Sequence, residues 1–101
     1  MAAMTITARN FEEQVLKNEK TVLLDFWAPW CGPCRMLGPV VEEIAGERAD
    51  IAVGKVNVDE EPELAKAFRV MSIPLLVVMK DGKAVTQSVG VKSKAAILGM
   101  L

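Results

Sequence analysis

The two cysteines of this chain lie three residues apart, and this spacing constrains the chain more than any other feature. They are Cys31 and Cys34, and they share one short segment with both tryptophans and two of the five prolines. That segment reads Trp27-Ala28-Pro29-Trp30-Cys31-Gly32-Pro33-Cys34. A Cys-x-x-Cys pair spans about one helical turn, so its two sulfur atoms can meet with little movement of the backbone.

The residues on either side of the pair predict a strand that leads into a helix. Residues 22–27 are apolar apart from Asp25, as is typical of a strand that is buried on both faces. After Pro33, apolar residues recur with the spacing of one helix face, at Leu37, Val40, Val41, Ile44 and Ala45. At such a helix start, the helix dipole and the free N–H groups favour a thiolate over a thiol. These features predict a redox-active dithiol at the end of a sheet.

Composition and charge exclude several classes of protein. The 101 residues are enough for one domain, which we place at 1–101. The net charge of −1 gives no indication of binding to nucleic acid or to an anionic membrane. No apolar run approaches the roughly 20 residues that a membrane helix needs. The chain has no histidine, which excludes His-dependent nucleophilic catalysis, and a zinc site would need carboxylates or a second chain in addition to the two cysteines.

The N-terminal residues carry no basic segment followed by a long apolar stretch, so we expect no secretory signal. This favours a reducing cytoplasm, where a cysteine pair is more often catalytic or metal-binding than a structural disulfide.

The rest of the chain predicts an α/β protein with the element order β-α-β-α-β-α-β-β-α. Its strands are expected near residues 5–7, 21–27, 51–58, 75–79 and 84–89, and its helices near 10–16, 33–48, 60–68 and from 93 onward. Asn10 and Glu13 resemble a capping box at the start of the first helix. Asp81-Gly82 indicates a hairpin. Helical crossovers should make the first three strands parallel neighbours, the hairpin should add an antiparallel pair, and helices should cover both faces.

At this point the sequence resembles the thioredoxin family. Residues 27–34 match the active-site segment of that family residue for residue. Asp25 occupies the family's buried-acid position, Ile73-Pro74 resembles the segment that carries its cis-proline, residues 80–83 resemble its hairpin turn, and Val89-Gly90 resembles its substrate-facing loop. The resemblance covers essentially the whole chain. It implies the thioredoxin fold, a central mixed five-stranded sheet flanked by four helices.

The same resemblance implies a general protein disulfide reductase that uses no bound cofactor and no metal, with the Cys31–Cys34 disulfide as its redox group. Such a protein would act as a monomer on diverse disulfide-containing proteins and would be reduced again by thioredoxin reductase. We expect Cys31 to be the nucleophile, facing solvent at the helix start, and Cys34 to be the resolving thiol. Gly32 and Pro33 set the gap between the cysteines, and rigid Pro33 either tunes the redox balance or serves only as a helix start.

Asp25 is the most informative residue outside the pair. Burial of an acid within an apolar strand should raise its pKa, and the resemblance implies that its carboxylate accepts the Cys34 proton. Lys55, in the third expected strand, is a neighbour that would modulate Asp25. The alternative is a buried acid that Lys55 or water satisfies, with little effect on catalysis.

Six residues should form an apolar rim around Cys31 that docks varied substrates: Trp30, Ile73, Pro74, Val89, Gly90 and Val91. For Val89 and Val91, the alternative to substrate docking is ordinary packing in the core. Two other functions stay open for the whole protein. One is a disulfide oxidase or isomerase, and the other is a binding subunit in which redox chemistry is incidental.

Overall fold

The computed structural model describes residues 3–101, so Met1 and Ala2 at the start of the expected domain lie outside the described residues. Its elements follow in the order β1 (Met4–Thr5), η1 (Glu12–Leu16), β2 (Thr21–Trp27), α1 (Gly32–Glu47), β3 (Ile51–Asn57), α2 (Pro62–Ala67), β4 (Leu75–Lys80), β5 (Lys83–Val89) and α3 (Lys94–Leu98). None of the helices in this part of the chain is both long enough and apolar enough to cross a membrane.

The five strands form one mixed sheet in the order β1-β3-β2-β4-β5. The first three strands are parallel, as predicted, because β3 pairs in parallel with both β1 and β2. They are also neighbours in one sheet, with β3 lying between β1 and β2. The hairpin strand β4 pairs antiparallel to β2, and β5 forms the edge.

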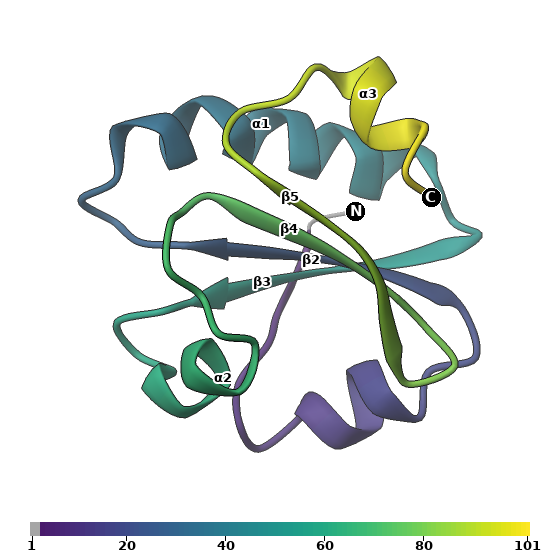
Figure 1. The fold of residues 1–101 in the computed structure, drawn as a ribbon. Coiled ribbons are helices and arrows are strands. Elements are labelled where there is room, and N and C mark those ends of the chain that lie inside the picture. Colours follow the sequence, from purple (N-terminus) through teal and green to yellow (C-terminus); the bar gives the residue numbers. More distant parts are fainter. Residues whose placement is uncertain (1–2) are drawn as a thin grey trace.

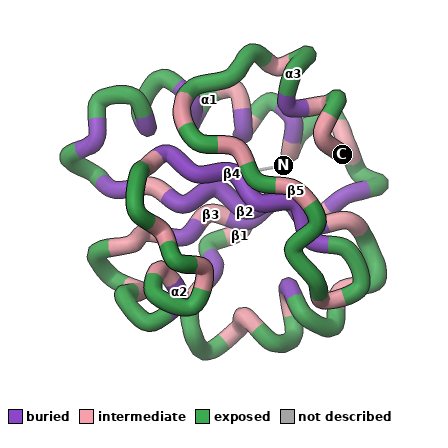
Figure 2. The backbone as a smooth tube through the Cα atoms, viewed as in Figure 1, coloured by how far each residue is buried: buried purple, intermediate pink, exposed green. Residues whose placement is uncertain are grey.

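Helices cover both faces of this sheet, as the element order predicted. Figure 1 shows α1 and α3 on one face and α2 with η1 on the other. Side chains alternate along β2, so Leu23 and Asp25 face α1 while Leu24 and Phe26 face α2. Figure 2 shows buried residues along β2, β3 and β4, while β5 is largely exposed. The apolar run in β2 therefore reflects a central strand that is covered twice.

The turn between β4 and β5 explains the Asp81-Gly82 signal. Both residues have positive φ angles, 53° for Asp81 and 75° for Gly82. A two-residue hairpin turn with two positive φ angles matches the twist of the strands that it joins, and Asp-Gly adopts it readily.

The first helix differs from the expectation, whereas the last helix begins where it was expected. The Asn10 side chain does not cap η1, because it accepts the Thr7 N–H at 2.8 Å and donates to the Thr5 carbonyl at 2.9 Å. The segment after it winds as a π-helix, Glu12–Leu16. The last helix, α3, begins after Ser93, whose hydroxyl accepts the Ala96 N–H at 3.1 Å.

Candidate active site

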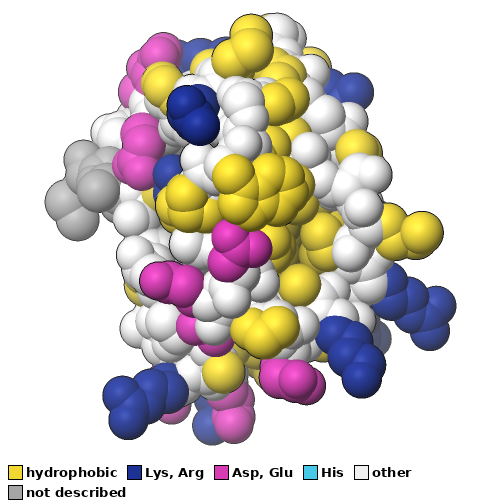
Figure 3. All heavy atoms as spheres, turned by 90° about the vertical axis from the view of Figure 1, so that its left-hand side faces the viewer, with side chains coloured by type: hydrophobic (Ala, Val, Ile, Leu, Met, Phe, Trp, Pro, Cys, Tyr) yellow, Lys and Arg dark blue, Asp and Glu magenta, His cyan; other side chains and the backbone are white. Residues whose placement is uncertain are grey.

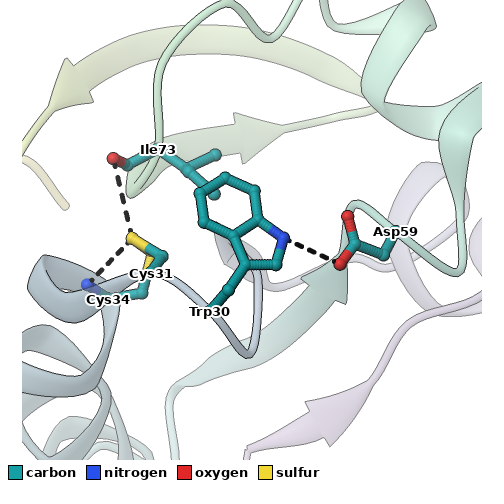
Figure 4. The surroundings of a disulfide bond; sticks show 5 residues. All are labelled: Trp30, Cys31, Cys34, Asp59 and Ile73. Atoms are coloured by element: carbon teal, nitrogen blue, oxygen red, sulfur yellow. Dashed lines mark hydrogen bonds between the residues drawn. A yellow bond between two sulfur atoms is a disulfide. The ribbon is translucent and has the colours of Figure 1, made fainter.

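The cysteine pair lies where β2 passes into α1, as the sequence predicted. Cys31 is the N-cap of α1 and has an extended backbone, while Cys34 lies in the first turn. The two residues are joined by a disulfide, with their Cα atoms 5.2 Å apart. Figure 4 shows the pair with its surroundings.

The helix start surrounds Cys31 with groups that favour a thiolate. The Cys31 Sγ accepts the backbone N–H of Cys34 at 3.2 Å. The Ile73 carbonyl oxygen lies 3.9 Å from the same sulfur and, as an acceptor, does not support a thiolate. The N-terminus of the 16-residue helix α1 adds its positive end. The expected difference in solvent exposure is not found, since both cysteines are buried to the same degree. The cysteines are therefore distinguished by their hydrogen bonding and position in the helix, not by their exposed area.

Gly32 and Pro33 occupy the first two helical positions. A Cβ on Gly32 would meet no atom within 4 Å, so packing does not require glycine there. Pro33 suits this position because the first N–H groups of a helix have no partner within it. Gly32 and Pro33 therefore leave the surface beside the disulfide open without distorting the helix start.

Asp25 is buried on the α1 face of the sheet, with 1% of its surface exposed. Neither carboxylate oxygen has a hydrogen-bond partner among residues 3–101. Burial raises the pKa of Asp25 to about 6, the Lys55 charge opposes this shift, and the Glu42 charge adds to it. A carboxyl with this pKa can change its protonation near neutral pH, which suits a proton acceptor.

Lys55 is the register partner of Asp25 in the neighbouring strand β3. Its ammonium makes no hydrogen bond to that carboxylate, and lies 3.9 Å from Glu42 Oε2 and 4.9 Å from the centre of the Trp27 ring. A pocket of ≈ 330 Å³ joins this ammonium to Cys34 along α1. Lys55 therefore acts on Asp25 through its charge alone.

The fold brings the expected rim residues to one end of the sheet. The Ile73–Pro74 bond is cis, as the resemblance implies, and the Gly90 N–H donates to the Pro74 carbonyl at 2.8 Å. Val89 and Val91 are exposed, so core packing does not account for them. Figure 3 views the molecule from the end where α1 begins and shows hydrophobic surface gathered across its middle.

Two residues beside the rim, Asp59 and Met71, were missed from the sequence. Asp59 Oδ2 accepts a hydrogen bond at 2.9 Å from Nε1 of the exposed Trp30 indole, as Figure 4 shows. Met71 is 95% exposed and, with Trp30 and Ile73, lines an apolar hollow of ≈ 250 Å³. Asp59 follows β3 as Trp30 follows β2, and the carboxyl ends of parallel strands meet at one edge, so topology offered a signal for Asp59. Nothing in the local sequence marked Met71.

Comparison with known proteins adds an independent line of support. The family model described as Thioredoxin matches residues 2–101. A thioredoxin of Mycobacterium tuberculosis is 53% identical over 98 residues, which cover 96% of this chain and 84% of that protein. A thioredoxin of Alicyclobacillus acidocaldarius is 48% identical over 101 residues, covering 99% and 95%. A bifunctional thioredoxin reductase/thioredoxin of Mycobacterium leprae is 49% identical over 94 residues, covering 92% of this chain and 20% of that protein.

Proposed function

Since this chain belongs to the thioredoxin family and is a dithiol–disulfide reductase, we propose that Cys31 is its nucleophile, Cys34 its resolving thiol and Asp25 the acceptor of the Cys34 proton. The redox group is the Cys31–Cys34 disulfide itself. The observation that carries this assignment is the hydrogen bond from the Cys34 N–H to the Cys31 sulfur.

In the first step, the Cys31 thiolate attacks one sulfur of a protein disulfide. The substrate S–S bond breaks, its second sulfur leaves as a thiolate that takes a proton, and a mixed disulfide joins Cys31 to the substrate. The Cys34 N–H at 3.2 Å and the positive end of α1 support the thiolate form of Cys31. No comparable donor contacts the Cys34 sulfur among residues 3–101, which favours Cys31 as the attacking group.

In the second step, Cys34 resolves the mixed disulfide. Its thiol gives its proton to the Asp25 carboxylate and its sulfur attacks Cys31 Sγ, so that the substrate leaves as a thiolate. The pair is then oxidised to the disulfide, and the substrate has gained two electrons. The position of Asp25 on the sheet face below α1, without a hydrogen-bond partner in the described chain, supports its role as the acceptor.

We assign substrate docking to the rim around Cys31. The Ile73 N–H makes no backbone hydrogen bond among residues 3–101, and the Ile73 carbonyl oxygen has only the Cys31 sulfur nearby. An extended substrate segment can therefore pair with this peptide unit beside the reacting sulfur. Exposed apolar side chains, among them Trp30 and Val89, provide contact area that demands little of the substrate sequence.

We further propose that the protein works as a monomer in the cytoplasm and receives its electrons from a thioredoxin reductase. The relative from Mycobacterium leprae, whose name joins a thioredoxin reductase with a thioredoxin, supports this partner. The partner is tested by following the reduction of the Cys31–Cys34 disulfide by a purified thioredoxin reductase, with glutathione alone as the comparison.

Trapping experiments test the roles of the two cysteines. Cys34→Ser should accumulate a mixed disulfide through Cys31 with an insulin substrate, because the resolving thiol is missing. Cys31→Ser should neither turn over nor trap substrate. A mixed disulfide through Cys34 in the Cys31→Ser variant would reverse the assignment.

The reduction potential of the pair tests the direction of electron flow. Equilibration against a thiol buffer at about pH 7 measures it, and about 30 mV corresponds to a tenfold change in the equilibrium constant. A potential well below that of the glutathione couple is expected for a reductase. A potential well above it would favour the oxidase or isomerase alternative.

A further inference from the structure

The ammonium of Lys55 does not bond with the acid that its backbone faces. Asp25 and Lys55 are partners in the parallel register of β2 and β3, so their side chains emerge side by side on the α1 face. Yet Asp25 lacks any hydrogen-bond partner among residues 3–101, while Lys55 Nζ lies beside Glu42 and the Trp27 ring. The lysine side chain is therefore drawn toward the outer edge of α1.

Glu42 is well placed to hold the Lys55 ammonium in this position. It lies eight residues after Cys34 on α1, so the two side chains share one face of the helix about two turns apart. One carboxylate oxygen, Oε1, accepts the Ala3 N–H at 2.7 Å, and the other, Oε2, is 3.9 Å from Lys55 Nζ. Gly38 lies between Cys34 and Glu42 on this face, and a Cβ there would be 3.8 Å from the same Nζ.

We propose that Glu42 is a positioning residue for the resolving step. It keeps the Lys55 ammonium at the outer edge of the pocket beside Cys34, and it thereby leaves the Asp25 carboxylate unpaired and able to accept a proton. This proposal rests on the role of Asp25 in the proposed function.

The charges around Asp25 make the direction of this effect definite. Lys55 comes from β3, Arg35 and Glu42 come from α1, and Glu60 lies beside Lys55 in the turn that follows β3. On the other side, β4 places uncharged Leu76 opposite Asp25. The Lys55 charge lowers the pKa of Asp25, and the Glu42 charge raises it.

Removing the Glu42 charge should lower the pKa of Asp25 in two ways. The direct repulsion between the two carboxylates disappears, and the freed ammonium can approach Asp25 and pair with it. Both changes favour the ionised form of Asp25 and make it a weaker base. A weaker base takes the Cys34 proton less readily during resolution.

The test is the pKa of Asp25 in Glu42→Gln, read from the carboxyl carbon shift of labelled aspartate in the oxidised protein. The oxidised form is used because its cysteines do not titrate. We expect this pKa to fall by roughly half a unit, which corresponds to about 0.7 kcal/mol. The Gln side chain keeps an oxygen that can accept the Ala3 N–H, so the fold should persist.

Glu43→Gln is the matched control, because it removes the same charge from the next position of α1. Glu43 pairs with Lys94, which keeps Glu47 as a second partner. This control should leave the Asp25 pKa unchanged. Lys55→Met then separates an effect through the lysine from a direct one, because Glu42→Gln should shift the pKa less in that background than in the parent protein.

Two outcomes would overturn the proposal. One is an Asp25 pKa in Glu42→Gln that matches the parent and the Glu43→Gln control. The other is an equally large shift with and without Lys55, which would mean that Glu42 acts directly. Neither outcome depends on whether Asp25 takes the Cys34 proton, which the rate of resolution in Asp25→Asn tests separately.

Discussion

Replacement of Asp25 by asparagine should stabilise the oxidised protein at neutral pH and should lose this advantage in acid. The carboxyl is 1% exposed, and burial raises its pKa from 3.8 to about 6. A shift of about two units, at 1.36 kcal/mol per unit, corresponds to about 3 kcal/mol of free energy of unfolding.

The sign follows from proton binding. The folded state binds the Asp25 proton more tightly than the unfolded chain does, so the parent protein loses stability as the pH rises from 3.8 to about 6. An asparagine at this position cannot ionise, and the variant therefore escapes this loss. Below this window Asp25 is protonated in both states and the charge contributes nothing.

Urea denaturation followed by circular dichroism measures the effect at about pH 3.5 and about pH 7.5. The difference in unfolding free energy between Asp25→Asn and the parent should grow by about 3 kcal/mol between the two conditions. Any fixed cost of the buried amide cancels in this comparison. Asp81→Asn, at an exposed turn position, should show no such growth. An Asp25→Asn difference that is the same at both pH values would refute the reasoning.

Two further predictions concern packing and docking. In Gly54→Ala, the new methyl would lie 2.5 Å from Ile6 Cγ1 and 3.2 Å from Leu24 Cδ2, so urea denaturation should show a loss of about 1–3 kcal/mol. The same change should cost less in an Ile6→Ala background, and equal costs in both backgrounds would contradict the packing argument. Met71→Glu places a charge beside the apolar hollow at the rim, so steady-state kinetics should show a higher KM for insulin. The reaction of the same variant with a small aromatic disulfide should be unchanged, and an equal loss for both substrates would argue against docking at Met71.

The sequence was sufficient for the central strands and the helix that carries the cysteines, because their patterns are strong. Residues 21–27 are expected as a strand and form β2, and the helix expected at 33–48 is α1, Gly32–Glu47. The start of the chain was less predictable, because Asn10 has two sets of backbone partners within reach. Its side chain bonds to residues behind it instead of capping the segment ahead.

In the candidate site, too, some residues could be predicted from the local sequence and others could not. Positions within the cysteine segment and Asp25 were marked by their own residue types. Asp59 and Met71 were not, because their importance comes from long-range placement beside Trp30. The partner of Lys55 was missed for a related reason. Sheet register brings Lys55 next to Asp25, but Glu42 reaches it from a helix, and no local pattern reports which acid the ammonium prefers.

The hydrogen bond from the Cys34 N–H to Cys31 has a consequence for how the protein changes between its oxidation states. The donor that a thiolate at Cys31 needs is already directed at that sulfur while the disulfide is intact. Opening the disulfide should therefore require the two sulfur atoms to separate, with little rearrangement of the helix around them. A partner that supplies electrons and a substrate that takes them should therefore meet nearly the same outer shape. Which way the two electrons pass is then decided by the reduction potentials of the partners and not by a change in the shape of the protein.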